Sequence, residues 1–298
     1  MQTRQNAPKE PRMQTLGQRA NSPSDPSHSE PNANLPRLVA TDMDGTFLDD
    51  HGGYDRVRFA RILSAIQGAG CRFVIASGNQ YYQLRSFFED DRELAYVAEN
   101  GALTVVDGEV LSCVSMEAEV LARTWQVIQD DGRAEAALCG RRCCHVQRGT
   151  ASDRFFRTMS RYFTRIEWVD DLADVDDTPL KFSLSVEDGS EGEVAGELSD
   201  ALESALVPVV SGNGSIDLMV PGCTKASALR LLCSRWGLSA SECVAFGDSE
   251  NDVEMLREAG WGYAMENASV RAKEAADSIC PSNQESGVLV TLESIFGL

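Results

Sequence analysis

Four short apolar runs in the chain share one pattern: each ends in small polar or acidic residues, and a helical pattern follows. The runs begin at Leu38, Phe73, Ile216 and Cys243. Apolar strands that alternate with helices predict an α/β fold whose parallel sheet is covered on both faces. Ligands of open α/β sheets bind beyond the carboxyl ends of the strands. The polar residues after all four runs are therefore expected to meet in one crevice.

The segment between the second and third runs differs from the rest of the chain. Helical patterns alternate in it with short predicted strands, which indicates a separate, inserted α+β domain. Its predicted helices are 117–130, 152–163 and 191–205, and its predicted strands are Ala136–Cys139, Cys143–Gln147, Arg165–Val169 and Lys181–Val186. The predicted parts of the chain are a disordered tail (1–36), a core (37–112 plus 207–298) and a cap domain (113–206).

Charge and composition disfavour several classes of binding partner and indicate where the protein is located. The formal net charge is −19, which disfavours nucleic acid and anionic lipid as partners. No apolar stretch approaches the roughly 20 residues of a membrane span, and no secretion signal is recognisable. Nine cysteines without a C-x-x-C pair indicate buried, reduced thiols, so we expect a cytoplasmic protein.

Candidate metal ligands follow the first and fourth apolar runs. Asp42 and Asp44 share one face of an extended segment, and Asp248 follows a strand expected to adjoin the first. Two carboxylates about 4 Å apart repel by about 4 kcal/mol at an effective dielectric of about 20. A cation, or a proton on one of the carboxylates, must offset this repulsion, and hard oxygen ligands suit Mg²⁺. The alternative is that Asp42 and Asp44 are ordinary turn and cap residues.

Candidate phosphate ligands begin the helices that follow the strands. Thr224 is a predicted N-cap, which places Lys225 at the positive end of a helix dipole, where only a bound anion makes a cation favourable. Ser77 has the same placement, although each residue could instead be a plain helix-start residue. Asn251 and Asp252 lie in a first helical turn, where Asp252 suits the dipole and Asn251 could orient Lys225 or a substrate oxygen.

Taken together, these residues resemble the haloacid dehalogenase superfamily. The segment from Thr41 to Leu48 resembles its first motif, Ser77 the second, Lys225 the third, and the segment from Gly247 to Asp252 the fourth. Segments Glu99–Ala102 and Met265–Ala268 are typical of the Cof-type subfamily (IIB), and the segments Ser77–Leu84 and Lys181–Leu184 resemble its bacterial sugar-phosphate phosphatases. The resemblance implies a Rossmann-like core with a C2-type cap. Asn79 and Ala226 depart from the commoner Arg and Gly of the subfamily.

The resemblance also implies a role for each motif residue. Asp42 is the expected nucleophile that forms an aspartyl phosphate, and Asp44 the expected general acid and base. Mg²⁺ is expected on Asp42, on Asp44 through its backbone carbonyl, and on Asp248, with Asp252 in support. The expected phosphate-binding and substrate-binding residues are Met43, Thr46, Ser77, Gly78, Lys225 and Asn251.

The expected function is therefore a Mg²⁺-dependent phosphatase that acts on small phosphate monoesters, namely sugar phosphates, without nucleic-acid or membrane partners. A phosphomutase or phosphotransferase with the same nucleophile is the alternative, and a non-catalytic phosphoacceptor module is a third reading. A monomer and a dimer are both compatible with the sequence. Candidates in the cap for contact with a sugar are Arg141, Arg142, His145 and Lys181, although each could also be a solvated surface group.

Overall fold

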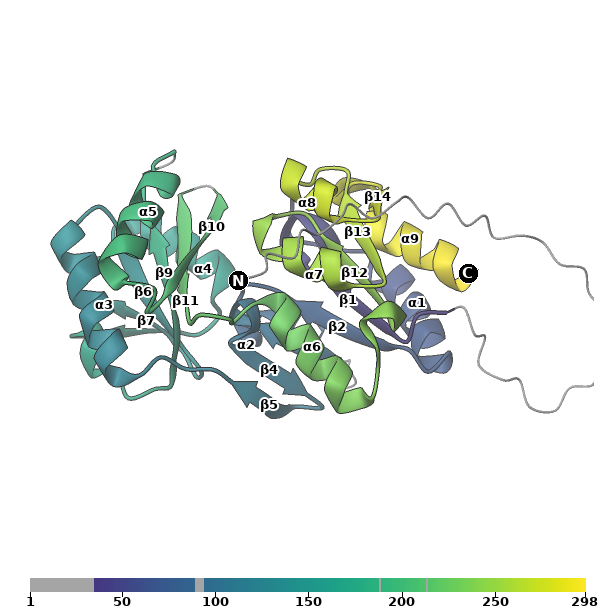
Figure 1. Cartoon of the computed structure of the whole chain (residues 1–298), viewed down its shortest axis with the longest axis horizontal. Coiled ribbons are helices and arrows are strands. Elements are labelled where there is room, and N and C mark those ends of the chain that lie inside the picture. Colours follow the sequence, from purple (N-terminus) through teal and green to yellow (C-terminus); the bar gives the residue numbers. More distant parts are fainter. Residues whose placement is uncertain (1–34, 89–93, 188, 213) are drawn as a thin grey trace, which may run out of the picture. The chain divides into compact units, whose positions relative to one another are not determined.

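The computed structural model describes residues 35–88, 94–187, 189–212 and 214–298. The predicted tail, 1–36, lies almost wholly outside these residues. The described chain contains two sheets, coloured by sequence in Figure 1. Among its helices, none is both long and apolar enough to cross a bilayer.

The first sheet forms the predicted α/β core. In spatial order its strands are β14 (Ser278–Cys280), β13 (Trp261–Met265), β12 (Cys243–Gly247), β1 (Leu38–Thr41), β2 (Arg72–Ala76), β3 (Ala95–Ala98), β4 (Leu103–Val106) and β5 (Glu109–Cys113). The six strands from β14 to β3 are parallel, and β4 and β5 form an antiparallel edge. Strand β1 is fully buried, as a strand covered on both faces must be.

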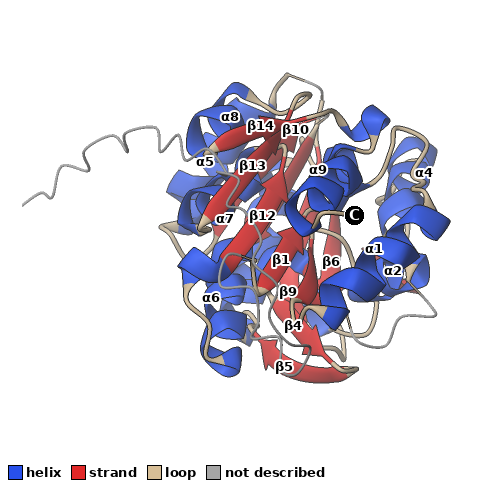
Figure 2. Cartoon of the chain, turned by 90° about the vertical axis from the view of Figure 1, so that its right-hand side faces the viewer, coloured by secondary structure: helices blue, strands red, loops and turns tan. Residues whose placement is uncertain are grey.

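Helices cover both faces of this sheet. They are α1 (Arg56–Gly68), α2 (Tyr81–Phe87), α6 (Lys225–Trp236), α7 (Val253–Glu258), α8 (Val270–Ala275) and α9 (Gly287–Phe296). Figure 2 shows α6, α7 and α8 on one side of the central strands and α1 and α9 on the other. The α/β fold class predicted from the apolar runs is confirmed.

The second sheet belongs to the inserted segment. Its order is β10 (Val207–Gly212), β11 (Ser215–Met219), β9 (Pro179–Ser185), β6 (Glu135–Gly140), β7 (Cys144–Gln147) and β8 (Ile166–Val169). Helices α3 (Ala118–Asp131), α4 (Asp153–Tyr162) and α5 (Glu191–Leu202) accompany it. All four strands and all three helices predicted within the insert are present, with ends shifted by at most a few residues.

One prediction about the core needs correction. The run that begins at Ile216 is not a strand of the parallel sheet, because it forms β11 of the second sheet and pairs antiparallel with β9 and β10. Ile216 and Leu218 pack in the apolar cluster of the insert, whereas Asp217 alternates to the opposite face. The second sheet thus continues to Met219, beyond the predicted cap boundary at residue 206.

Candidate active site

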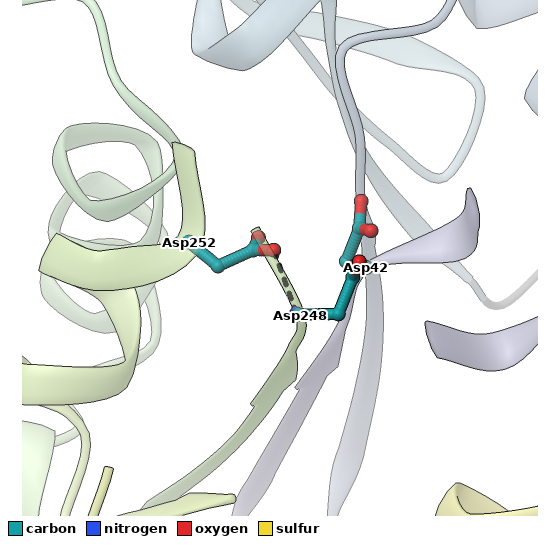
Figure 3. Close-up of side chains that lie close together, drawn as sticks. All are labelled: Asp42, Asp248 and Asp252. Carbon is teal, nitrogen blue, oxygen red and sulfur yellow. Dashed lines mark hydrogen bonds between the residues drawn. The ribbon is translucent and has the colours of Figure 1, made fainter. Parts of the chain in front are cut away.

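The ends of three adjacent strands and the start of one helix supply the candidate residues. Asp42 follows β1, Ser77 follows β2 and Asp248 follows β12, and β1 lies between the other two strands. Lys225 is the first residue of α6, after Thr224, whose side chain caps the helix in a reciprocal box with Ser227. The predicted convergence of these segments is therefore present, and Figure 3 shows how Asp42, Asp248 and Asp252 face one another.

Lys225 is a buried ammonium held between two carboxylates. Its Nζ donates to Asp42 Oδ1 at 2.6 Å and to Asp252 Oδ1 at 2.7 Å, and its side chain has no exposed surface. Burial alone lowers the pKa of Lys225, but Asp252 and Asp42 together raise it above its usual value. Lys225 is therefore charged at neutral pH, and the alternative of an exposed lysine at a helix start is wrong.

Asp252 holds this arrangement in place. Its Oδ2 accepts hydrogen bonds from the backbone N–H groups of Asp248 at 3.0 Å and Ser249 at 3.1 Å, while its Oδ1 accepts from Lys225. Both oxygens of this fully buried carboxylate are thus bonded within the chain. Asp252 orients Lys225 and the loop after β12, a larger role than an acidic residue that only suits a helix dipole.

Asp42, Asp248 and Asp252 form an acidic cluster. One carboxylate oxygen of each lies within 4.8 Å of the others. Burial, reinforced by Asp252, raises the pKa of Asp248 to about 6, and burial also raises the pKa of Asp42, with Lys225 opposing. Three carboxylates facing one ammonium leave an excess of negative charge. Hard oxygen donors with such an excess fit a divalent metal ion.

The turn after Asp42 brings Thr46 to the same cluster. Thr46 Oγ1 donates to Asp248 Oδ1 at 2.9 Å. Gly45 has a φ of 73°, and a Cβ there would lie 2.6 Å from Asp248 Oδ2, so both the backbone and the close approach require glycine. Asn267 Nδ2 donates to the Gly45 carbonyl at 2.7 Å, a contact that the sequence did not predict. The Asp42 side chain makes no capping hydrogen bond in this turn.

The turn after β2 lies beside Asp44. Asn79 Nδ2 donates to Asp44 Oδ2 at 2.6 Å, and the Asn79 backbone N–H donates to Ser77 Oγ at 3.1 Å. Desolvation by the surrounding protein raises the pKa of Asp44, while the bond from Asn79 opposes the rise. The residue keeps contact with solvent, which limits this rise and leaves its carboxyl open to a reactant.

Comparison with known proteins agrees with this geometry. Residues 39–292 match the haloacid dehalogenase-like hydrolase family. The chain is 39% identical over 260 residues to 5-amino-6-(5-phospho-D-ribitylamino)uracil phosphatase YbjI of Escherichia coli, covering 87% of this chain and 96% of that protein. It is 26% identical over 255 residues to the Bacillus subtilis phosphatase YcsE, which bears the same enzyme name, covering 85% and 92%.

A solved structure has the same fold over most of this chain. The crystal structure of SMU.1108c from Streptococcus mutans superposes with a TM-score of 0.84 at 35% identity, over 88% of this chain and 100% of that one. The chain belongs to the haloacid dehalogenase-like hydrolase family. The family resemblance inferred from the four motifs is confirmed, and so is the assignment of the chain as a phosphatase.

A second buried network joins the cap to the core of this haloacid dehalogenase-like hydrolase. Lys181 Nζ, on β9, lies 2.7 Å from Asp217 Oδ2 and 3.2 Å from Glu99 Oε2, and it donates to the Gly78 carbonyl at 2.7 Å. Asn100 Nδ2 also donates to Asp217 Oδ2, at 2.8 Å. Lys181 is 2% exposed, so it is not the solvated surface group that its place on an insert allowed.

The remaining candidates lie elsewhere. Asn251 Nδ2 donates to Asn100 Oδ1 at 2.9 Å, so it contacts the second network and not Lys225. Arg142 Nε lies 3.4 Å from Asp177 Oδ1, and the buried His145 Nε2 lies 3.1 Å from Asp177 Oδ2. Of the predicted cap candidates, Arg142 and His145 thus contact one cap carboxylate, Asp177, whereas Lys181 contacts the turn after β2.

Proposed function

We propose that this phosphatase hydrolyses sugar phosphates in a Mg²⁺-dependent reaction with Asp42 as the nucleophile. The observation that carries the proposal is the acidic cluster at the strand ends, in which the buried Lys225 ammonium lies 2.6 Å from Asp42 Oδ1 and Asp248 adjoins it. An ammonium at this position attracts a phosphate group to the carboxylate that is to attack it.

The first step forms an aspartyl phosphate. A carboxylate oxygen of Asp42 attacks the phosphorus while the bond from phosphorus to the substrate alcohol breaks. Asp44 gives its proton to the departing alkoxide, so that the neutral alcohol leaves. The raised pKa of Asp44 supports this role, since it keeps a larger fraction of the carboxyl protonated. Asn79 fixes the carboxyl in place through its 2.6 Å bond.

The second step restores the enzyme. Asp44, now ionised, takes a proton from a water molecule whose oxygen attacks the phosphorus. The bond between phosphorus and Asp42 breaks, inorganic phosphate leaves, and Asp44 is again protonated. The net reaction consumes one water and releases one alcohol and one phosphate.

Asp42, Asp248 and the backbone carbonyl of Asp44 would hold Mg²⁺, with Asp252 and Thr46 orienting these ligands. When bound, the cation offsets the repulsion between the attacking carboxylate and the phosphate dianion. The raised pKa values of Asp42 and Asp248 support this need, because ionisation of both groups requires positive charge beyond that of Lys225.

Other groups would bind the phosphate oxygens. Lys225 supplies a charge, Ser77 a hydroxyl, and Met43 and Gly78 backbone N–H groups beside the strand ends. We place the enzyme in the cytoplasm, since all nine cysteines are free. Sugar phosphates are proposed because two relatives similar over most of their length are named for a phosphorylated ribityl compound.

The proposal is tested by Asp42→Asn. Removing the nucleophilic carboxylate should lower phosphate release from p-nitrophenyl phosphate at least about 10³-fold. Asp107→Asn, which changes an exposed carboxylate at a positive φ that Asn tolerates, is the matched control and should keep wild-type activity. EDTA should stop the wild-type reaction, and Mg²⁺ should restore it.

A panel of hexose, pentose, pentitol and ketose phosphates then tests the substrate class. We expect several of them to be hydrolysed with release of inorganic phosphate. Isomerised phosphosugar without free phosphate would identify a mutase, and an Asp42 phosphate that persists for many minutes would identify a phosphoacceptor. Undiminished activity of Asp42→Asn would refute the proposed mechanism.

A further inference from the structure

The Lys181 side chain crosses from the cap to the turn that follows β2. Lys181 belongs to the second sheet, yet its Nζ donates to the carbonyl of Gly78 in the core at 2.7 Å. Its charge is already offset within the network by Asp217 and Glu99. The bond to the Gly78 carbonyl is therefore not needed to neutralise the ammonium. It must have another effect on the turn after β2.

The Gly78–Asn79 peptide group is held on both sides. Lys181 donates to its carbonyl oxygen, and its N–H donates to Ser77 Oγ at 3.1 Å. A hydroxyl that accepts a bond in this way has its own proton available for another acceptor. Under the proposed function, this acceptor is a phosphate oxygen of the substrate.

We infer that Lys181 is a positioning residue that acts from the cap, through the Gly78–Asn79 peptide group, to direct the Ser77 hydroxyl at the substrate phosphate. The inference rests on the proposed function, because it assumes that a phosphate binds beside Ser77. Hydrogen bonds in a chain polarise one another, and a bond from an ammonium at the carbonyl end makes the peptide N–H a stronger donor.

The same turn orients the proposed general acid. Asn79 Nδ2 donates to Asp44 Oδ2 at 2.6 Å through its side chain, and this bond holds the turn from the side of the core. Asn100 packs on the other side, with its side-chain amide 3.2 Å from the position of a Cβ on Gly78. The turn therefore has little room to adopt another conformation once Lys181 is in place.

Further contacts from the cap fix the helix that follows this turn. Gln80 Nε2 donates to the Arg165 carbonyl at 3.0 Å, and Gln83 Nε2 donates to the Arg161 carbonyl at 2.7 Å. The segment from Gly78 to Gln83 is thus bonded to the cap through β9, through α4 and through the residue that precedes β8. The geometry of Ser77 consequently depends on the cap being in contact with the core.

A double-mutant cycle between Lys181 and Ser77 tests the inference. Because Lys181→Met alone leaves two buried carboxylates without their cation, the cycle is measured in an Asp217→Asn background, where the amide oxygen can still accept from Asn100. In this background Lys181→Met should lower kcat for p-nitrophenyl phosphate about 10- to 100-fold, the range for a lost bond to a charged group. When Ser77→Ala is also present, Lys181→Met should lower kcat by less than about threefold.

The controls separate positioning from folding. Lys181→Gln, whose amide can donate to the Gly78 carbonyl, should retain more kcat than Lys181→Met and serves as the second variant if Met prevents folding. Arg123→Met removes an exposed cap cation that bonds only within the cap, and it should leave kcat unchanged. Thermal unfolding is recorded for every variant to establish that it is folded.

Two results would overturn the inference: a Lys181→Met loss below threefold in a folded protein, or equal losses with and without Ser77. A purely structural role predicts equal losses. Failure of the proposed function is distinguishable, because the wild-type enzyme would then release no phosphate from any substrate and the cycle would have no starting activity.

Discussion

Two lysines are buried in the part of the chain that the structure describes, each between two carboxylates, and their settings differ. Lys225 lies 2.6 Å from Asp42 and 2.7 Å from Asp252 at the strand ends of the core. Lys181 lies 2.7 Å from Asp217 and 3.2 Å from Glu99 where the cap meets the core. Burial lowers the pKa of each lysine, and the paired carboxylates more than reverse that effect in both.

The two clusters differ in how their carboxylates are bonded. In the core cluster, both oxygens of Asp252 accept hydrogen bonds. The third carboxylate, Asp248, adds a negative charge that could bind a cation. Neither oxygen of Glu99 makes a hydrogen bond to a described residue, although one lies within ion-pair distance of Lys181. Burial raises the pKa of Glu99 to about 7, so this carboxylate is partly neutral at neutral pH.

If the proposed function is correct, the same local set of charges serves catalysis in one place and architecture in the other, depending on its surroundings. At the strand ends, three carboxylates face one ammonium, which leaves an excess of negative charge that a divalent cation would offset. At the cap, the cluster is closed off and its hydrogen bonds lead to the backbone of the core. One substitution made in both places should therefore have different consequences for activity and similar consequences for stability.

The largest expected effect is that of Lys225→Met, compared with Lys181→Met. Each change leaves buried carboxylates without their cation and should lower the free energy of unfolding by about 3–5 kcal/mol. Lys225→Met should also lower kcat by about 10³-fold or more, because it removes a charge aimed at the phosphate. Urea unfolding and phosphate-release assays measure the two quantities. Equal losses of kcat in the two variants would show that the clusters do not differ in function.

The next effect concerns Asn100, which links the clusters. Its side chain donates to Asp217 and accepts from Asn251, and its backbone has a φ of 54°. Asn100→Ala should lower the free energy of unfolding by about 3–4 kcal/mol, from two lost partners and a left-handed backbone.

Asn100→Gly is the matched variant, since it loses the same bonds and tolerates the backbone. It should be about 1 kcal/mol more stable than Asn100→Ala in urea unfolding. If the two variants were equally stable, backbone conformation would contribute nothing at this position.

The rule that ligands gather at strand ends predicted much of the core site. It placed Asp42, Ser77 and Asp248 together before any contact was known, since each directly follows an apolar strand. The inferences for these three residues succeed because each depends on a local pattern and on one general property of parallel sheets. Lys225 was also expected there, but partly for a wrong reason: the run from Ile216 that precedes it is not a strand of the parallel sheet, and only its place at a capped helix start was correct.

The cap network depends on contacts that no local pattern encodes. Lys181 meets Gly78 across 103 positions of sequence, and Asn79 meets Asp44 across 35. The run from Ile216 was assigned to the wrong sheet because a short apolar strand has the same appearance in either. Asp217 in its middle was the available signal, since alternation of apolar and polar residues is typical of antiparallel strands with one polar face.

An effect smaller than that of Asn100→Ala is a dependence of stability on pH from Glu99, which faces Lys181, Asp217 and Cys139. The folded pKa of about 7 lies above the value of 4.5 for an unperturbed Glu, so the folded state binds more protons between these pH values. Stability from this group therefore falls as pH rises from about 4.5 to 7, by at most about 3 kcal/mol. Above pH 7 the contribution is constant.

Glu99→Gln removes this titration and keeps the shape of the side chain. The variant should match the wild-type protein in urea unfolding near pH 5 and exceed its free energy of unfolding near pH 8. Glu109→Gln changes an exposed position on β5 and is the control. Its free energy of unfolding should differ from that of the wild-type protein by the same amount at pH 5 and pH 8. Because Asp42 and Asp248 titrate in both proteins, their effects cancel in the comparison. A constant difference between pH 5 and pH 8 would mean that the Lys181 cluster holds Glu99 ionised throughout, making the two lysine clusters more alike than their hydrogen bonds indicate.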